Sequence, residues 1–263
     1  MKTMDTRPIG IFDSGVGGLS IYREIKKLLP KESYIFIADQ KNVPYGGKSE
    51  YQLRKISDRI VKYFIKRNVK MIVVACNTAT CCAIDFLRKK YPSLPLVGTV
   101  PAIKTAAELS HRKSIAVLST PATAKSSYIK GLIRKYAAGV TVVNVDCPNL
   151  ENLIEQGTMN SLSVKILLKK YLEKALVQKP DYIVLGCTHY PFLKSTIQRL
   201  SKAKTVDSGR AIAKRAKNLL SALGIENSRK LSITYLTTGD PEIFSKTASR
   251  LLRSRVTAKK LEI

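Results

Sequence analysis

Two cysteines occupy matching positions at the ends of predicted buried strands. Cys76 follows the apolar run MIVVA (71–75), Cys187 follows YIVLG (182–186), and two polar residues come directly after each cysteine. A thiolate can remove a proton and a thiol can deliver one, so two facing cysteines could act as base and acid on opposite sides of one carbon. A single such cysteine is by default an inert buried residue. Two in matching contexts favour proton-transfer chemistry.

Each of these cysteines is expected to stand where a strand passes into a helix. The N–H groups and dipole of a helix N-terminus favour negative charge, which predicts a thiol pKa below the usual value of about 8.5. The polar neighbours could hydrogen-bond a substrate carboxylate or the thiolate; they are Asn77, Thr78, Thr188 and His189. The remaining cysteines, Cys81, Cys82 and Cys147, are interpreted as structural.

A glycine-rich loop, DSGVGG (13–18), follows the first predicted strand. Its pattern is incomplete as a dinucleotide-binding fingerprint, because Ser20 stands where the third glycine belongs, and Asp13 would repel a pyrophosphate. We expect Asp13 to bind an ammonium group while backbone N–H groups bind a carboxylate. A tight turn that needs glycine for its backbone angles and binds nothing remains the alternative.

A second loop, VPYGGKS (43–49), follows the next predicted strand and contains Tyr45 and Gly46. Parallel strands present their carboxyl ends at one sheet edge, so this loop should lie beside Asp13 and Cys76. The alternative is a simple helix-entry turn capped by Ser49.

Short apolar runs alternate with amphipathic stretches along the chain. Strands are predicted at 8–12, 34–38, 71–75, 115–119, 141–145, 182–186 and 231–236, and helices at 19–28, from Ser49 to about 68, and from Pro121 to about 138. This alternation indicates an α/β fold with mainly parallel sheets flanked by helices. The two similar strand–cysteine segments indicate two related lobes.

Composition excludes several other classes of protein. No apolar run reaches 18 residues and no secretory signal is visible, so we expect a cytoplasmic protein without a membrane span and with free thiols. The motifs C-x-x-C, H-E-x-x-H and G-x-S-x-G are absent, which argues against a metal site and a serine hydrolase.

The basic charge is the most unusual bulk property. Lys and Arg total 46 against 19 Asp and Glu, giving a formal net charge of +27 among 263 residues. Such a surface attracts polyanions, and weak, salt-sensitive nucleic-acid binding is one interpretation. The charges are scattered and Trp is absent, so a solvated basic surface is the other.

Seven segments in chain order together resemble the glutamate racemases of the aspartate/glutamate racemase superfamily. They are IGIFDSGVGGLSI (9–21), ADQKNVPYGGKS (38–49), ACNTAT (75–80), VGTVPAIK (97–104), CPNLENLIEQG (147–157), LGCTHYPFL (185–193) and VDSG (206–209). The resemblance implies two lobes with the active site in the cleft between them. It places 1–97 with 208–263 in lobe one, which carries Cys76, and 98–207 in lobe two, which carries Cys187.

The same resemblance implies a reaction and a set of site residues. It implies racemisation of L-glutamate to D-glutamate without a cofactor or metal, supplying D-glutamate for peptidoglycan, and we expect a homodimer. Cys76 and Cys187 match the catalytic cysteines; Asp13 would assist Cys76, and His189 with Glu155 would assist Cys187. The implied substrate-binding residues are Asp13, Ser14, Tyr45, Gly46, Asn77, Thr78, Thr188 and His189.

Two other functions stay open from the sequence. An aspartate racemase or related isomerase of the superfamily is the nearest, although Thr188-His189-Tyr190 favours the glutamate type. A polyanion-binding protein on a racemase-like scaffold is the alternative of another class.

Overall fold

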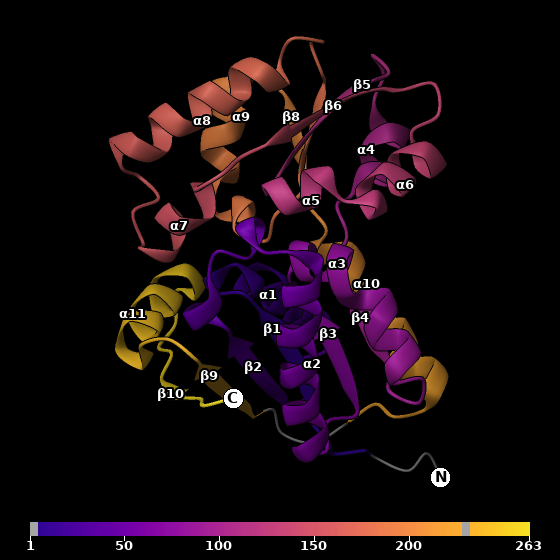
Figure 1. The fold of residues 1–263 in the computed structure, drawn as a ribbon, viewed down its shortest axis with the longest axis vertical. Helices are drawn as coiled ribbons and strands as arrows, with labels where there is room; N and C mark the ends of the chain where they lie inside the picture. The colour runs from indigo at the N-terminus through magenta and orange to yellow at the C-terminus, as the bar shows by residue number, and fades with distance from the viewer. Residues whose placement is uncertain (1–4, 228–231) are drawn as a thin grey trace.

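Two parallel sheets, one above the other in Figure 1, form the frames of two lobes in this computed structural model, which describes residues 5–227 and 232–263. The lower sheet has the order β10-β9-β2-β1-β3-β4 and the upper sheet the order β6-β5-β7-β8. The lower strands are β1 (Ile9–Asp13), β2 (Tyr34–Ala38), β3 (Met71–Val74), β4 (Leu96–Gly98), β9 (Ile233–Thr237) and β10 (Ala258–Lys260). The upper strands are β5 (Ser114–Ser119), β6 (Thr141–Asp146), β7 (Tyr182–Leu185) and β8 (Lys204–Val206).

The two sheets repeat one topology. The order β2-β1-β3-β4 in the lower lobe corresponds strand by strand to β6-β5-β7-β8 in the upper lobe, and the strands pair in parallel. Strands β3 and β7 therefore hold equivalent positions. The residues that follow them must lie at equivalent places on the two carboxyl edges, where open α/β sheets bind ligands.

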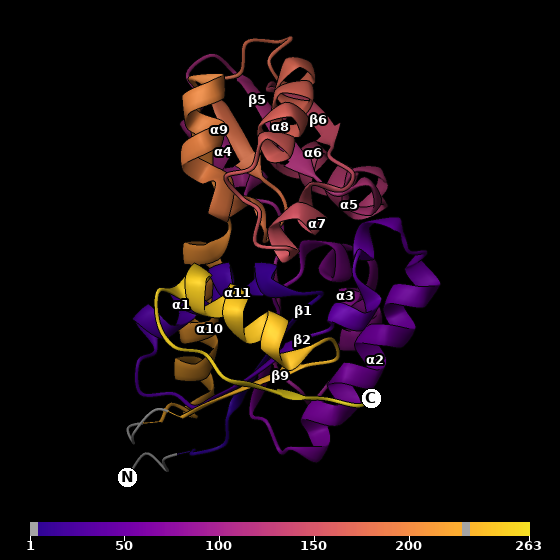
Figure 2. The same ribbon diagram turned by 90° about the vertical axis from the view of Figure 1, so that its left-hand side faces the viewer.

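Helices cover both faces of each sheet (Figures 1 and 2). In the lower lobe, α1 and α10 pack together on one face and α2 and α3 on the other. The bounds of the lower helices are α1 (Leu19–Leu28), α2 (Glu50–Lys66), α3 (Asn77–Lys90), α10 (Gly209–Leu223) and α11 (Pro241–Leu252). Those of the upper lobe are α4 (Ile103–Leu109), α5 (Pro121–Lys125), α6 (Ser127–Tyr136), α7 (Leu150–Glu155), α8 (Leu162–Ala175) and α9 (Lys194–Ser201). None of the described helices is long and apolar enough to cross a membrane.

The predicted α/β class and parallel sheets are confirmed, as is the helix that Ser49 caps, whose side chain accepts a hydrogen bond from the backbone N–H of Gln52. The single helix predicted from Pro121 to about 138 is wrong. Two helices, α5 and α6, replace it, because Ser126 has an extended backbone and its side chain caps α6. Of the strand predicted at 231–236, Leu231 lies outside the described residues, Ser232 precedes β9, and 233–236 belong to β9.

The last part of the chain returns to the lower lobe. Helix α10 packs on α1, β9 pairs with β2, and β10 extends the sheet beyond β9. The precise lobe boundaries at 97/98 and 207/208 stay a proposal; the first of them falls inside β4.

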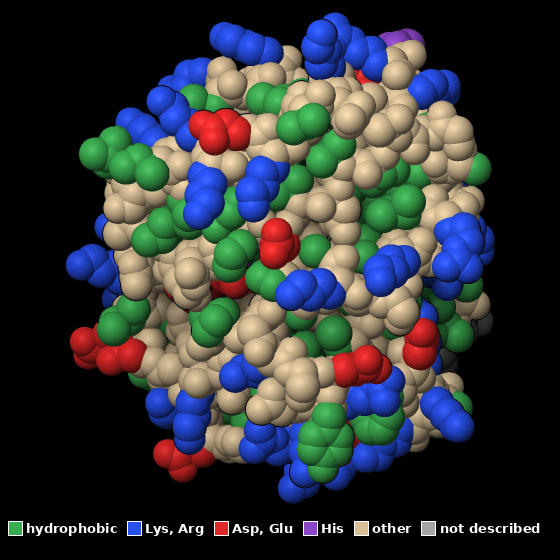
Figure 3. All heavy atoms as spheres, turned by 45° about the horizontal axis from the view of Figure 1, so that its top comes forward, with side chains coloured by type: hydrophobic (Ala, Val, Ile, Leu, Met, Phe, Trp, Pro, Cys, Tyr) green, Lys and Arg blue, Asp and Glu red, His purple; other side chains and the backbone are tan. Residues whose placement is uncertain are grey.

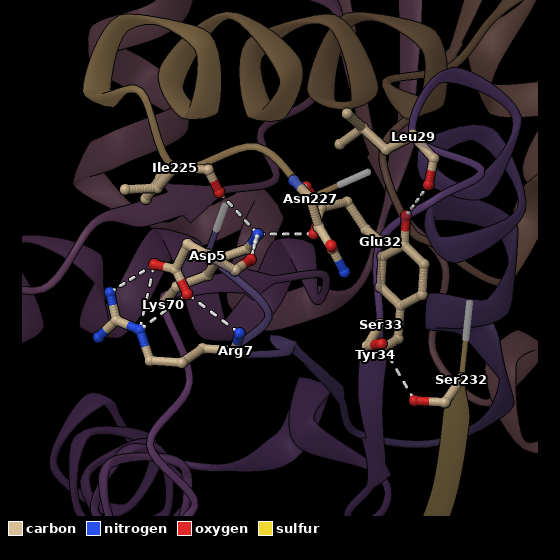
Figure 4. Close-up of polar contacts among 10 residues, drawn as sticks. All are labelled: Asp5, Arg7, Leu29, Glu32, Ser33, Tyr34, Lys70, Ile225, Asn227 and Ser232. Atoms are coloured by element: carbon tan, nitrogen blue, oxygen red, sulfur yellow. Dashed lines mark hydrogen bonds and ion pairs between the residues drawn. The ribbon is translucent and has the colours of Figure 1, made fainter. Parts of the chain in front are cut away.

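A buried ion pair joins distant segments at the base of the lower lobe (Figure 4). Lys70, which is 2% exposed, places its Nζ 2.7 Å from Glu32 Oε2. The same ammonium donates to the backbone oxygens of Asp5 and Ile225, and Glu32 Oε1 accepts from the backbone N–H of Asn227. The pair therefore connects the start of β1 with the loop before β2 and the end of α10.

Replacing Lys70 by methionine is expected to lower the free energy of unfolding by about 3–5 kcal/mol, because Glu32 would be left as an uncompensated buried charge. Chemical denaturation followed by circular dichroism measures the change. Lys62→Met is the matched control: Lys62 pairs with Asp58 but its side chain is 58% exposed, so a loss within about 1 kcal/mol is expected. Equal losses in the two variants would contradict a structural role for the buried pair.

Candidate active site

The carboxyl edges of the two sheets meet around a small cavity between the lobes. Its volume is about 10 Å³, roughly the room that one water molecule needs. The lower lobe contributes Ser14, Tyr45, Gly46, Cys76, Asn77 and Thr78, and the upper lobe contributes Thr120, Glu151, Cys187, Thr188 and His189. The cavity thus brings together both predicted cysteines and most of the predicted substrate-binding residues.

Both thiols line this cavity, but their surroundings differ. Cys76 is the N-cap of α3, and its Sγ accepts a hydrogen bond from the backbone N–H of Ala79 at 3.4 Å. Cys187 lies in a turn between β7 and the short 3-10 helix Tyr190–Leu193, so no α-helix begins at it. Its Sγ is instead 3.5 Å from His189 Nδ1. A helix N-terminus therefore stabilises one thiolate and an imidazole the other.

The prediction that both thiols have lowered pKa values is wrong in direction. Burial raises the pKa of Cys76 well above its usual value, the carboxylate of Asp13 raises it further, and the N–H of Ala79 opposes both effects only partly. Burial also raises the pKa of Cys187, against the opposing influence of His189. Desolvation by the closed lobes outweighs helix and imidazole, and a thiolate formed here is a correspondingly stronger base.

A hydrogen-bonded chain runs from Cys187 through His189 to Glu155. His189 Nε2 lies 2.6 Å from Glu155 Oε1, which also accepts the backbone N–H of Val16 at 2.7 Å. Burial lowers the pKa of His189, but Cys187 and Glu155 outweigh it and hold that pKa well above its usual range. A charged imidazole beside Cys187 favours the thiolate form of this cysteine.

Glu155 itself lies behind the cavity wall. Its second oxygen, Oε2, accepts a hydrogen bond from Gln40 Nε2 at 2.7 Å. The loop before α1 approaches so closely that a Cβ added at Gly15 would lie 1.9 Å from Glu155 Oε1. Glycine at position 15 therefore leaves space for the carboxylate of Glu155, which hydrogen-bonds His189.

Asp13 also lies behind the lining rather than in it. Its Oδ2 accepts the backbone N–H groups of Gly15 and Gly18 at 3.1 and 2.9 Å, and its Oδ1 accepts the hydroxyl of Thr188 at 3.2 Å. Burial raises the pKa of Asp13. The carboxyl group therefore joins the two lobes next to the thiols, and Ser14 is the loop residue that reaches the cavity.

Hydroxyl and amide groups complete the wall. Thr78 Oγ1 lies 2.8 Å from Thr120 Oγ1 and adds another link between the lobes. The Asn77 side chain donates to the backbone oxygen of Thr99 at 3.4 Å, and the Tyr45 hydroxyl donates to Asp39 Oδ2 at 2.6 Å. The threonine hydroxyls and the second N–H of the Asn77 amide would suit the carboxylate groups of a small anionic substrate. Among the described residues, no cluster of three or more His, Cys, Asp or Glu could hold a metal ion.

Two lining residues, Thr120 and Glu151, were not among the predicted site residues. Thr120 follows β5 as Ser14 follows β1, and Glu151 comes after β6 as Tyr45 and Gly46 come after β2. The internal repeat that the cysteines revealed could have found both residues, had it been extended to the other strand pairs.

The comparisons with known proteins agree with this geometry. Residues 9–216 match the family model described as Asp/Glu/Hydantoin racemase. The chain belongs to this family. A protein of Roseiflexus sp. (strain RS-1) named glutamate racemase is 40% identical over 95% of this racemase and 94% of its own length.

Solved structures extend the similarity to the whole fold. The Francisella tularensis glutamate racemase in complex with D-glutamate has a TM-score of 0.86 and 29% identity, covering 99% of this racemase and 98% of that chain. The Escherichia coli glutamate racemase, in complex with L-glutamate and the activator UDP-MurNAc-ala, has a TM-score of 0.85 and 35% identity, covering 97% and 98%. Family and relatives together make this chain an amino-acid racemase, an isomerase with a two-lobed fold.

Proposed function

We propose that this racemase interconverts L- and D-glutamate and that Cys76 and Cys187 are its two acid–base groups. The observation that carries the proposal is that two thiols line one cavity and that each follows an equivalent strand of its lobe. Relatives named glutamate racemase, two of them in complex with the enantiomers of glutamate, support the choice of substrate.

In the proposed mechanism, the Cys187 thiolate removes the α-proton of L-glutamate and the Cys76 thiol delivers a proton to the opposite face. Cys187 finishes the turnover as a thiol and Cys76 as a thiolate, which is the state required for D-glutamate as substrate. No cofactor takes part. His189, held by Glu155, stabilises the Cys187 thiolate, and Asp13 acts near Cys76 by keeping the two lobes in register.

The cavity itself contributes to lowering the barrier. Ser14, Tyr45, Gly46, Asn77, Thr78 and Thr188 would hold the substrate through hydrogen bonds to its carboxylate and ammonium groups. Closure of the lobes excludes water, which strengthens these interactions with the carbanionic transition state. Because the space between the lobes is small, they must separate for substrate to enter.

A chiral assay tests the substrate. Purified protein is supplied with L-glutamate and L-aspartate in separate, parallel reactions. The kcat/KM for L-glutamate should be at least about 100-fold above the kcat/KM for L-aspartate, a ratio that a site built to hydrogen-bond its substrate can reach. Preference for aspartate would establish the alternative member of the superfamily. Absence of racemisation of either amino acid would overturn the proposed function.

The cellular role that we propose is supply of D-glutamate for peptidoglycan in a bacterial cytoplasm. Expression of this chain should restore growth of a bacterial strain that requires added D-glutamate, and the Cys76→Ser variant should not. Equal rescue by the variant would contradict the link between catalysis and growth.

We also propose a homodimer. Apolar side chains on α8 support this: Leu162 and Ile166 lie one turn apart and are 72% and 60% exposed, and exposed apolar groups favour association. Sedimentation should give a dimer for the wild type and a monomer for Ile166→Lys. A monomeric wild type would overturn the proposal.

Weak polyanion binding is a second proposed property, supported by the distribution of charge. Lys and Arg side chains clearly outnumber acidic ones on the face shown in Figure 3. At the far end of the upper lobe, a groove of about 530 Å³ is lined in part by Arg112, Lys179, Lys202 and Lys204. Duplex DNA should bind with an affinity that falls steeply with salt. Retention of DNA independent of salt, or none at low salt, would contradict this.

A further inference from the structure

Glu151 presents an unused carboxyl oxygen to the active-site cavity. It stands in the first turn of α7, is 5% exposed and lines the cavity together with both cysteines. Within the described chain, its Oε2 is fully buried and has no hydrogen-bond partner. Its Oε1 lies against the loop of the opposite lobe, 3.2 Å from where a Cβ on Gly46 would be.

Asp13 and Glu155, which lie behind the cavity wall, differ from Glu151 in this respect. Both oxygens of Asp13 and both oxygens of Glu155 accept hydrogen bonds from the protein. Their positions are therefore explained by the architecture of the site. Burying a polar atom without a partner costs stability. The unpaired oxygen of Glu151 is therefore explained if the substrate supplies its hydrogen-bond partner.

The charged and titratable groups around Glu151 decide whether its carboxyl group is ionised or neutral. The groups near it are His189, Glu155, Cys187 and Cys147 within the upper lobe, and Tyr45 and Cys76 across the cavity. His189 is the one cation among them, and it is already paired with Glu155 and Cys187. Burial raises the pKa of Glu151. Its own backbone N–H and the charge of His189 oppose this shift but do not outweigh it. With one oxygen buried and unpaired, the carboxyl is more stable as the neutral acid, which is a hydrogen-bond donor.

We propose that Glu151 is a specificity-determining residue that donates a hydrogen bond from its neutral carboxyl group to a carboxylate of the substrate. This inference rests on the racemisation of glutamate proposed above. It assigns the site to acidic amino acids, which carry a second carboxylate for the extra donor. The competing role is an ionised Glu151 that binds the substrate ammonium group. It predicts that Glu151→Gln, which removes the negative charge, raises the KM for L-glutamate as much as Glu151→Val does.

Two substitutions separate these roles. Glutamine at this position is a neutral donor of the same shape, so Glu151→Gln should keep the KM for L-glutamate within about threefold of the wild type. Valine has no donor, so Glu151→Val should raise KM about tenfold or more with a smaller change in kcat. Glu108→Gln, whose side chain is 63% exposed on α4, is the matched control and should leave both constants unchanged.

Thermal unfolding distinguishes binding from a structural role. Because the free oxygen destabilises the unliganded protein, Glu151→Val should have a Tm at or above that of the wild type. A rise in KM for Glu151→Gln as large as that for Glu151→Val would overturn the neutral-donor role, and so would unchanged KM in both. These outcomes require a wild type that racemises glutamate; an inactive wild type would instead overturn the proposed function.

Discussion

Cys76→Ser and Cys187→Ser should each lower kcat for glutamate racemisation by about 1,000-fold or more. A serine hydroxyl is a far weaker acid than a thiol. It therefore does not form the alkoxide that would act as the base on one face, and it donates its proton poorly when it must act as the acid on the other. General acid–base catalysis by one group contributes about 10²–10⁴-fold. Racemisation needs both groups in every turnover, so either substitution should suffice. Polarimetry or chiral chromatography measures the loss in both directions.

Another cysteine provides the matched control. Cys82→Ser changes a thiol on α3, beyond the cavity lining and only partly buried, and should retain activity within about twofold. The circular dichroism spectra of all three variants should match the wild type. Activity of either Cys76→Ser or Cys187→Ser near the wild-type level would exclude the roles assigned to these residues.

His189→Asn should lower kcat/KM about 100-fold, the second-largest effect that we expect. The two enantiomers have equal free energy, so kcat/KM must fall by the same factor in both directions. His189 opposes the effect of burial on the pKa of Cys187, and its removal therefore raises that pKa. Less thiolate then exists at a given pH, so the rising limb of the pH profile of kcat/KM should move to higher pH.

Glu155→Gln tests whether His189 depends on its carboxylate. The carboxylate raises the pKa of His189, so the amide should lower that pKa and leave less imidazolium to stabilise the Cys187 thiolate. The pH profile should therefore shift in the same direction as for His189→Asn, but by less. His111→Asn, on the exposed far end of the upper lobe, should leave the profile unchanged. A rising limb that stays in place for His189→Asn would show that the imidazole does not govern the base.

The sequence could predict the parts of this fold that carry strong periodic patterns. The strand at 34–38 has the predicted bounds, and both cysteines lie at strand ends. Strands β4, β8 and β10 were missed because each has only three residues, too few for a hydrophobic pattern. The break at Ser126 was missed because a serine that caps a helix is also tolerated inside one.

The site was harder to predict where it depends on contacts between the lobes. Residue types led to Cys76 and Cys187, which line one cavity, but not to the degree of their burial, which reverses the predicted direction of the pKa shifts. Desolvation depends on the closeness of two lobes that are built from distant segments. Glu151 was missed because the internal repeat was not extended from the cysteines to β2 and β6. Its close approach to Gly46, where an added Cβ would lie 3.2 Å from Oε1, is a feature of the folded chain.

Racemisation in D₂O, sampled during the first few per cent of conversion, tests the two-thiol mechanism most directly. With one thiol on each face, product D-glutamate should carry deuterium at the α-carbon while unreacted L-glutamate keeps its hydrogen. The reverse reaction should show the same pattern. Product that retains the substrate's own α-hydrogen, or deuterium that enters both enantiomers equally from the start, would indicate a single base and contradict the account.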